Sequence, residues 1–232
     1  MEHLFITLLL VAGAVVAGWY LNRTVVISNI RVEGNQMTHT REILETSSVK
    51  EGMHADSIRY LEIISRVEAL PWVEKAHITV SPSGQMRIRI EEAEPLALLR
   101  DRNRSAWVTA SGIQLPVILG TEVDVPVLYG FRISDRQDTL VSGEFSTARD
   151  FLLAARKYPE VYSAIGEVMV TVDEGVVVLT AENAVRVTLG HDQFDDRLRT
   201  WRAFQSQVIS EKGITAMQSI DFRYRGQVVT RE

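Results

Sequence analysis

Carboxylates are the side chains of this sequence that first suggest chemistry. Glu91, Glu92 and Glu94 lie close together, and paired carboxylates can act as acid and base when their environments separate their pKa values. The three residues follow a strand-like alternation and precede Pro95, which favours a solvated strand end over a catalytic pair. Asp124 and the pair Asp195-Asp196 have no obvious partner in the pattern.

The other residue types give no catalytic set. The five histidines are His3, His39, His54, His77 and His191, and none pairs with another at metal-ligand spacing. The absence of cysteine excludes disulfides, thiolate metal sites and cysteine nucleophiles. The glycine-rich phosphate loops, the H-E-x-x-H motif and the G-x-S-x-G elbow are all missing. We therefore expect a protein that binds partners, with no enzymatic activity, cofactor or metal.

Composition is that of an ordinary globular protein. The chain has 232 residues, enough for one or two domains, and a formal net charge of −5. Nucleic-acid binding usually needs a basic stripe, and the sequence has none, so we expect no nucleic-acid partner.

The N-terminal segment departs from this ordinary composition. Residues 4–21 read LFITLLLVAGAVVAGWYL and carry no charge, close to the ~20 apolar residues of a transmembrane helix. Trp19 and Tyr20 suit the lipid–water boundary. We predict a short tail over 1–3 and a membrane span over 4–21. A cleaved signal peptide, with a cleavage site near 12–14, and a buried helix remain alternatives.

Residues 25–96 predict a small α+β domain in the order β-α-α-β-β. A strand pattern ends at Gly34-Asn35, and a short helix begins after a cap at Thr38 or Thr40. A second helix is expected from Asp56 to Pro71, with one apolar stripe. That stripe consists of Ile58, Leu61, Ile64, Val67 and Leu70. Trp72 is expected to fill the corner before a hairpin that turns at 82–84.

Residues 97–232 predict a mostly β domain with two helices. One helix is expected from Ser146 to Lys157, ended by Pro159, and a longer one over 193–210. A meander over 168–189 lies between them, and two strands about Arg225-Gly226 end the chain. A terminal strand at a sheet edge can accept a partner strand, although Phe222 and Tyr224 could equally be packed strand residues.

Motifs in both regions resemble the FtsQ/DivIB family of bacterial cell division proteins. I-R-V-E-G-N (30–35), L-P-W-V-x-x-A (70–76) and the I-x-I-x-E run before Pro95 resemble its POTRA domain. W-V-x-x-x-G (107–112), V-P-V-L-x-G (125–130), V-T-L-G (187–190) and I-D-F-R-Y (220–224) are similar to its β domain. The chain departs from the pattern at Ala93, where arginine is common, and in lacking a tryptophan after the last turn.

The resemblance implies a non-enzymatic, single-pass protein of the cytoplasmic membrane. Its N-terminus would be cytoplasmic, and its two domains would lie outside the membrane at the division septum. It would assemble with FtsB and FtsL, link early and late division proteins, and help recruit septal cell-wall synthesis. FtsB would add a strand at the C-terminal strand, which assigns partner docking to Arg223, Tyr224, Arg225 and Gly226.

Two other functions are compatible with the residues. A POTRA-type chaperone or secretion component would use the same edge-strand chemistry, usually with several POTRA units. A tethered cell-envelope hydrolase would need a working carboxylate, for which Glu92 is the candidate.

Overall fold

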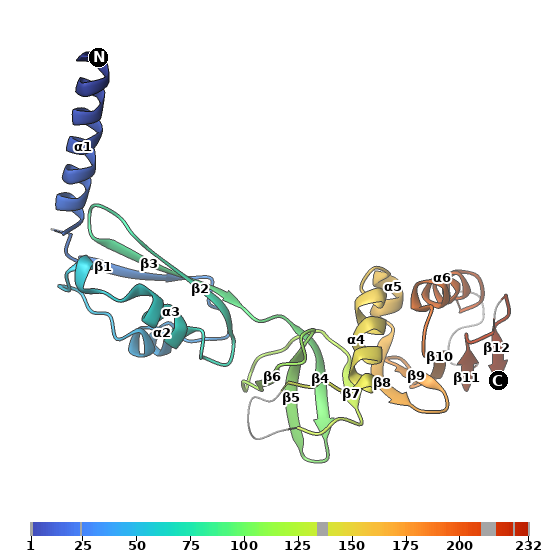
Figure 1. The fold of residues 1–232 in the computed structure, drawn as a ribbon. Coiled ribbons are helices and arrows are strands. Elements are labelled where there is room, and N and C mark those ends of the chain that lie inside the picture. The colour runs from blue at the N-terminus through green and yellow to red at the C-terminus, as the bar shows by residue number, and fades with distance from the viewer. Residues whose placement is uncertain (1, 24, 134–138, 210–216, 225, 232) are drawn as a thin grey trace. The chain divides into compact units, whose positions relative to one another are not determined.

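The computed structural model describes residues 2–23, 25–133, 139–209, 217–224 and 226–231 (Figure 1). The chain divides into two compact units, residues 1–93 and 94–232. Each unit has its own hydrophobic core.

Helix α1 (Glu2–Arg23) begins the first unit. It contains the uncharged stretch 4–21, and its side chains from Ile6 to Gly18 are exposed. None of the helices in the described part of the chain combines the length and apolar character needed to cross a membrane. The predicted span over 4–21 is therefore not confirmed.

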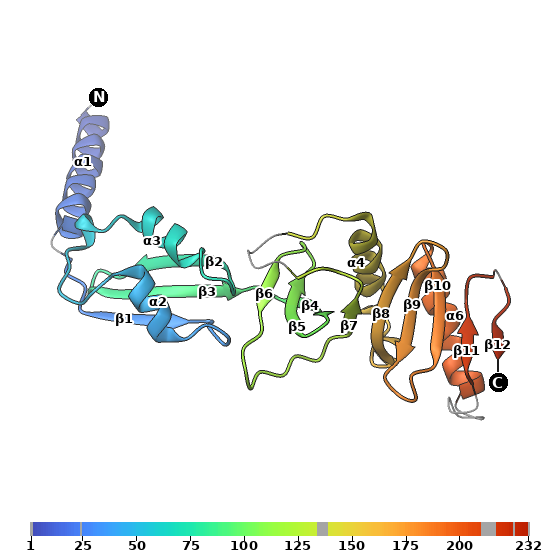
Figure 2. The same ribbon diagram turned by 90° about the horizontal axis from the view of Figure 1, so that it is seen from below.

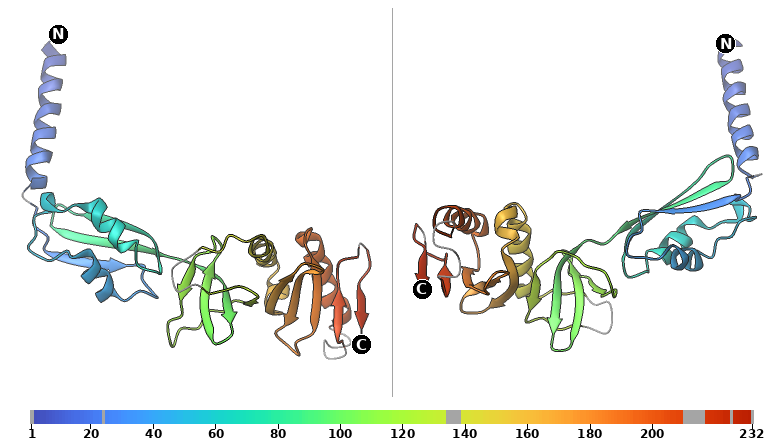
Figure 3. Two further views of the ribbon diagram at one scale, coloured as in Figure 1. Left: turned by 60° about the horizontal axis from the view of Figure 1, so that its bottom comes forward. Right: turned by 180° about the vertical axis from the view of Figure 1, so that it is seen from behind.

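A three-stranded sheet with two helices on one face makes up the rest of the first unit (Figures 1 and 3). Central strand β3 pairs parallel with β1 and antiparallel with β2. The elements are β1 (Asn29–Glu33), α2 (Thr40–Ser47), the 3-10 turn η1 (Ala55–Ser57), α3 (Tyr60–Val67), β2 (Val73–Val80) and β3 (Gln85–Glu92). The predicted β-α-α-β-β order is confirmed.

The core of this unit lies between the helices and the sheet. Its most deeply buried side chains come from α2, α3 and β3: Ile43, Ile63, Val67, Met86, Ile88 and Ile90. Leu61, predicted to face inward, is 82% exposed. The prediction was wrong because residues 55–57 form a 3-10 turn and α3 begins only at Tyr60, which places Ile63 on the inward face instead.

The junction between α3 and β2 is built around Pro71. Helix α3 ends at Val67, and the Leu70 N–H donates to the Val67 carbonyl at 3.1 Å in a last turn. Pro71 has no N–H and cannot continue the helix. Trp72 is buried, as predicted, and its carbonyl accepts the N–H of Ala93 at 2.9 Å. The junction thereby ties the start of β2 to the end of β3.

The second unit is a mixed nine-stranded sheet with helices on one face (Figure 2). The strand order is β12-β11-β10-β9-β8-β7-β4-β5-β6. The strands are β4 (Pro95–Asp101), β5 (Arg104–Thr109), β6 (Gln114–Pro116), β7 (Val127–Tyr129), β8 (Ile165–Thr171), β9 (Gly175–Thr180), β10 (Arg186–Gly190), β11 (Ser219–Asp221) and β12 (Val229–Arg231).

Helical connections separate two of the parallel strand pairs of this sheet, whereas the parallel pair β4 and β7 has β5 and β6 between them in the chain. The pair β7 and β8 is parallel, and α4 (Gly143–Ala155) and α5 (Pro159–Tyr162) lie between them in the chain. The pair β10 and β11 is also parallel, and α6 (Phe194–Phe204) with the π-helical turn η2 (Gln205–Ile209) lies between them. Parallel neighbours require such crossovers, whereas antiparallel neighbours can be joined by a tight turn.

Two details of the helices differ from the prediction. The hydroxyl of Ser142, not that of Ser146, caps α4 by accepting the Phe145 N–H at 3.2 Å. Pro159 was expected only to end a helix, but it occupies the first turn of α5, where its missing N–H costs no hydrogen bond. The described residues of this unit therefore include one short α-helix, α5, in addition to the two predicted.

Candidate partner interface

Strand β12 is the outermost strand at one end of the second sheet, so one of its sides borders no described strand (Figure 1). Its other side pairs antiparallel with β11, where Ile220 lies opposite Thr230. All three β12 residues are exposed. An edge strand of this kind offers backbone N–H and C=O groups to an added strand.

The predicted docking residues lie in the connection from β11 to β12, residues 222–228. Arg223 is partly buried, Tyr224 is 54% exposed, and Gly226 is exposed with φ of 71°. Arg225 lies outside the described residues. The connection is longer than the predicted two-residue turn, because β11 already ends at Asp221.

Phe222 and Tyr224 have opposite environments. Phe222 is buried and stacks on Trp201 of α6, with ring centroids 5.8 Å apart and an interplanar angle of 21°. Phe204 meets the same ring edge-on at 5.9 Å. Phe222 therefore anchors the connection to α6, whereas more than half of the Tyr224 surface is exposed.

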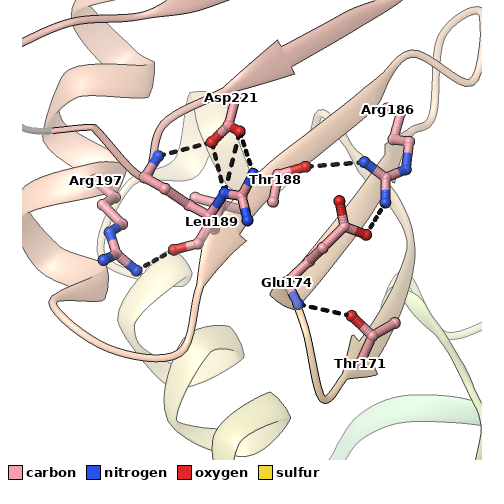
Figure 4. Close-up of polar contacts among 8 residues, drawn as sticks. Thr171, Glu174, Arg186, Thr188, Leu189, Arg197 and Asp221 are labelled. Atoms are coloured by element: carbon pink, nitrogen blue, oxygen red, sulfur yellow. Dashed lines mark hydrogen bonds and ion pairs between the residues drawn. The ribbon is translucent and has the colours of Figure 1, made fainter.

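Asp221 fixes the chain just before Tyr224 (Figure 4). Its Oδ1 accepts the backbone N–H of Arg223 at 2.9 Å, and its Oδ2 accepts Nη2 of the same arginine at 2.7 Å. Burial alone would raise the pKa of Asp221, but the hydrogen bonds and charge of Arg223 outweigh it, so the pKa is lowered. The hydrogen bond to Asp221 in turn raises the pKa of Arg223. Both groups are therefore charged at neutral pH.

A second arginine supports the same region from α6. Arg197 donates to the carbonyl of Leu189 at the end of β10 (Figure 4) and to Asp192 at 3.0 Å. Gly190 leaves room for it, since a Cβ there would lie 2.4 Å from Nη1 of Arg197 and 3.3 Å from Cγ of Arg223. The glycine also has φ of 72°, which other residues rarely adopt.

Arg186 links β10 to the hairpin between β8 and β9. Its guanidinium contacts the carboxylate of Glu174 and donates to the Thr188 hydroxyl at 3.1 Å (Figure 4). The Glu174 N–H donates to the Thr171 hydroxyl at 3.2 Å. Strand β10 is therefore held by the polar contacts of Arg186 and Arg197. Strand β11 pairs with β10, and β12 pairs with β11.

Sequence reasoning missed this supporting set. The motifs 187–190 and 220–224 contain Gly190 and Asp221, yet neither was assigned a role. Arg197 was not assigned a role, because its contact with β10 is to a backbone carbonyl, which a sequence pattern cannot identify. The short spacings between Asp221 and Arg223 and between Asp192 and Arg197 could have suggested local ion pairs.

The acidic cluster is divided among separate structural contacts. Glu91 contacts a histidine on β2 at 3.3 Å, and Glu92 accepts the backbone N–H groups of residues 36–38 at 2.7–3.1 Å. Glu94 belongs to the second unit and contacts Arg156 at 2.8 Å. No three His, Asp or Glu residues in the described ranges lie close enough together to hold a metal ion.

Comparison with known proteins matches both units. The FtsQ-type POTRA domain matches residues 25–93, and the domain described as FtsQ/DivIB, C-terminal related, matches residues 94–231. The second match alone covers more than half of the chain.

Similar relatives are named as cell division proteins. The cell division protein FtsQ of Rhodothermus marinus is 29% identical over 220 residues, covering 92% of this chain and 80% of the relative. FtsQ of Salinibacter ruber is 28% identical, covering 96% and 90%. The cell division protein DivIB of Bacillus subtilis is 24% identical, covering 80% and 68%. The chain therefore belongs to the FtsQ/DivIB family of bacterial cell division proteins.

Proposed function

We propose that this protein is a non-enzymatic scaffold of the division machinery that binds FtsB- and FtsL-like partners by strand addition at β12. The observation that carries the proposal is the exposed edge of β12 next to Tyr224, in a domain of the FtsQ/DivIB family. Through these partners the protein links early and late division proteins and helps to recruit septal cell-wall synthesis.

The edge and its connection supply the two parts that strand addition needs. Backbone groups along β12 provide affinity that depends little on side chains. Tyr224 provides an aromatic anchor beside the strand, and tyrosine is enriched among residues that dominate binding energy. Asp221 and Phe222 hold the connection in place, so little ordering is required when a partner binds.

The proposal includes a membrane tether. The uncharged stretch 4–21 lies within helix α1, directly before the POTRA domain. In the proposed topology the N-terminus is cytoplasmic and both units are extracytoplasmic. Extraction of the full chain from membranes with carbonate tests the tether, because an integral protein stays in the pellet and a peripheral protein is released.

Tyr224→Glu tests the interface. A lost aromatic anchor costs ~2 kcal/mol, or about 30-fold in Kd, for the purified full chain and its FtsB-like partner. Leu119→Glu is the matched control, since Leu119 is 96% exposed and lies between β6 and β7, away from β12 in the sheet order. Equal affinities for the two variants would refute the docking role of Tyr224.

Localisation tests the cellular role separately. An N-terminal fluorescent fusion is expected to form a band at midcell before constriction ends. A uniform signal around the envelope would contradict a role in division, whatever the binding assay shows.

A further inference from the structure

The β4–β5 hairpin ends in a hollow that no step of the proposed function uses. Its volume is about 560 Å³. Every residue that lines it is charged or polar: Asp101, Arg102, Asn103, Arg104 and Arg132. The hollow lies within the second unit, and Arg132 reaches it from the segment that follows β7.

The charge of this hollow is opposite to that of the chain. Three arginines and one aspartate give a formal charge of 3 − 1 = +2, whereas the whole chain carries −5. Within the described ranges, neither Arg102 nor Arg132 forms an ion pair with an acidic side chain. Their guanidinium groups are therefore available to an external anion.

The backbone at Arg102 is unusual for an arginine. Its φ is 52°, in the left-handed region that glycine and asparagine adopt most readily. A residue held there costs conformational energy, and such residues concentrate at binding sites. The turn places an arginine where glycine would be the easier choice for the backbone.

The lining favours a compact anion over a peptide. Peptides that dock through apolar or aromatic anchors find none in this hollow, and peptides that bind arginine clusters do so through an anionic group. Guanidinium groups bind phosphate oxygens through two parallel N–H donors, and the charge of +2 matches a doubly charged phosphate. We propose that the hollow binds a phosphate group, either in a soluble phosphate compound or in a phosphomonoester lipid headgroup.

Two probes separate these sources for the full chain. Calorimetric titration with sodium pyrophosphate measures binding of a soluble phosphate compound. Flotation with phosphatidylcholine vesicles, with and without phosphatidic acid, measures binding of a phosphomonoester headgroup. Saturable binding to either probe is expected, weakened at least about tenfold by the double substitution R102Q/R132Q.

The control substitution R41Q/R199Q changes the net charge by the same amount. Arg41 and Arg199 are exposed helix residues that contact nearby glutamate or aspartate side chains outside the hollow. R102G provides a second test, because glycine suits the left-handed backbone and removes the guanidinium without straining the turn.

The outcomes decide the proposal. Binding of pyrophosphate that R102Q/R132Q and R102G weaken would support a soluble phosphate ligand. Binding only to phosphatidic acid vesicles, with the same loss, would support a lipid headgroup. Two results would overturn the phosphate site. One is that R102Q/R132Q binds the probes as tightly as the control R41Q/R199Q, and the other is that neither probe binds saturably.

Discussion

Replacing Glu92 with alanine should destabilise the POTRA unit far more than its position at a strand end suggests. Its carboxylate accepts the backbone N–H groups of Gln36, Met37 and Thr38, which follow β1 in the chain. Glu92→Ala removes all of these bonds at once and detaches this loop from the end of β3.

The magnitude follows from the burial of the three donors. Thr38 is buried, so its N–H would lose its partner without gaining water, at a cost of ~1–3 kcal/mol. Gln36 is exposed and Met37 is partly exposed, so each can be rehydrated at a cost of ~0.5 kcal/mol. We expect a total loss of ~2–4 kcal/mol in the free energy of unfolding of this unit.

Hydrogen exchange can measure this loss unit by unit. The slowest amides of β3 report the unfolding of the POTRA unit, and the Thr38 amide reports the loop directly. Glu91→Ala is the control, because Glu91 is next in the chain, is half-exposed and contacts a surface histidine. Its loss should cost under ~0.5 kcal/mol. If the amides of β3 and Thr38 exchange at the same rates in E92A and E91A, the three hydrogen bonds do not stabilise the loop.

Three further predictions concern the second unit. Gly190→Ala should displace Arg197 and strain the backbone, costing ~2 kcal/mol or more in thermal unfolding, and an unchanged Tm would contradict the close approach. The lowered pKa of Asp221 contributes stability at neutral pH that is lost as pH falls below about 4, so Asp221→Asn should flatten this acid dependence in pH-dependent melts. Ser142→Ala should cost ~1 kcal/mol by removing the α4 cap, while Ser146→Ala should cost less.

Elements with regular hydrophobic spacing were predictable from the sequence. The alternation of Met86, Ile88 and Ile90 correctly predicted both the strand and the face of it that is buried. The turn at Gly84 and the break at Pro71 also followed from local chemistry, because each residue restricts the backbone in a known way. These features depend on neighbours in the chain, and so they are visible in sequence.

Features that depend on distant backbone groups were not predictable. Glu92 was interpreted as solvated because its partners, residues 36–38, lie more than fifty positions away. Leu61 was placed in the core because the 3-10 turn that shifts α3 leaves no hydrophobic signature. The edge position of β12 follows from how α6 carries the chain from β10 to β11, which no local pattern encodes.

The two residues that flank the peptide bond between Ala93 and Glu94 are each held by contacts within their own unit. Ala93 donates to the Trp72 carbonyl in the first unit, whereas Arg156 donates to Glu94 and to the Pro95 carbonyl in the second. Cutting the chain at this bond would break none of these contacts. This boundary is therefore a suitable site for joining domains. Either domain could be exchanged there for another of its kind, and the remaining domain would keep its own hydrogen bonds at the boundary.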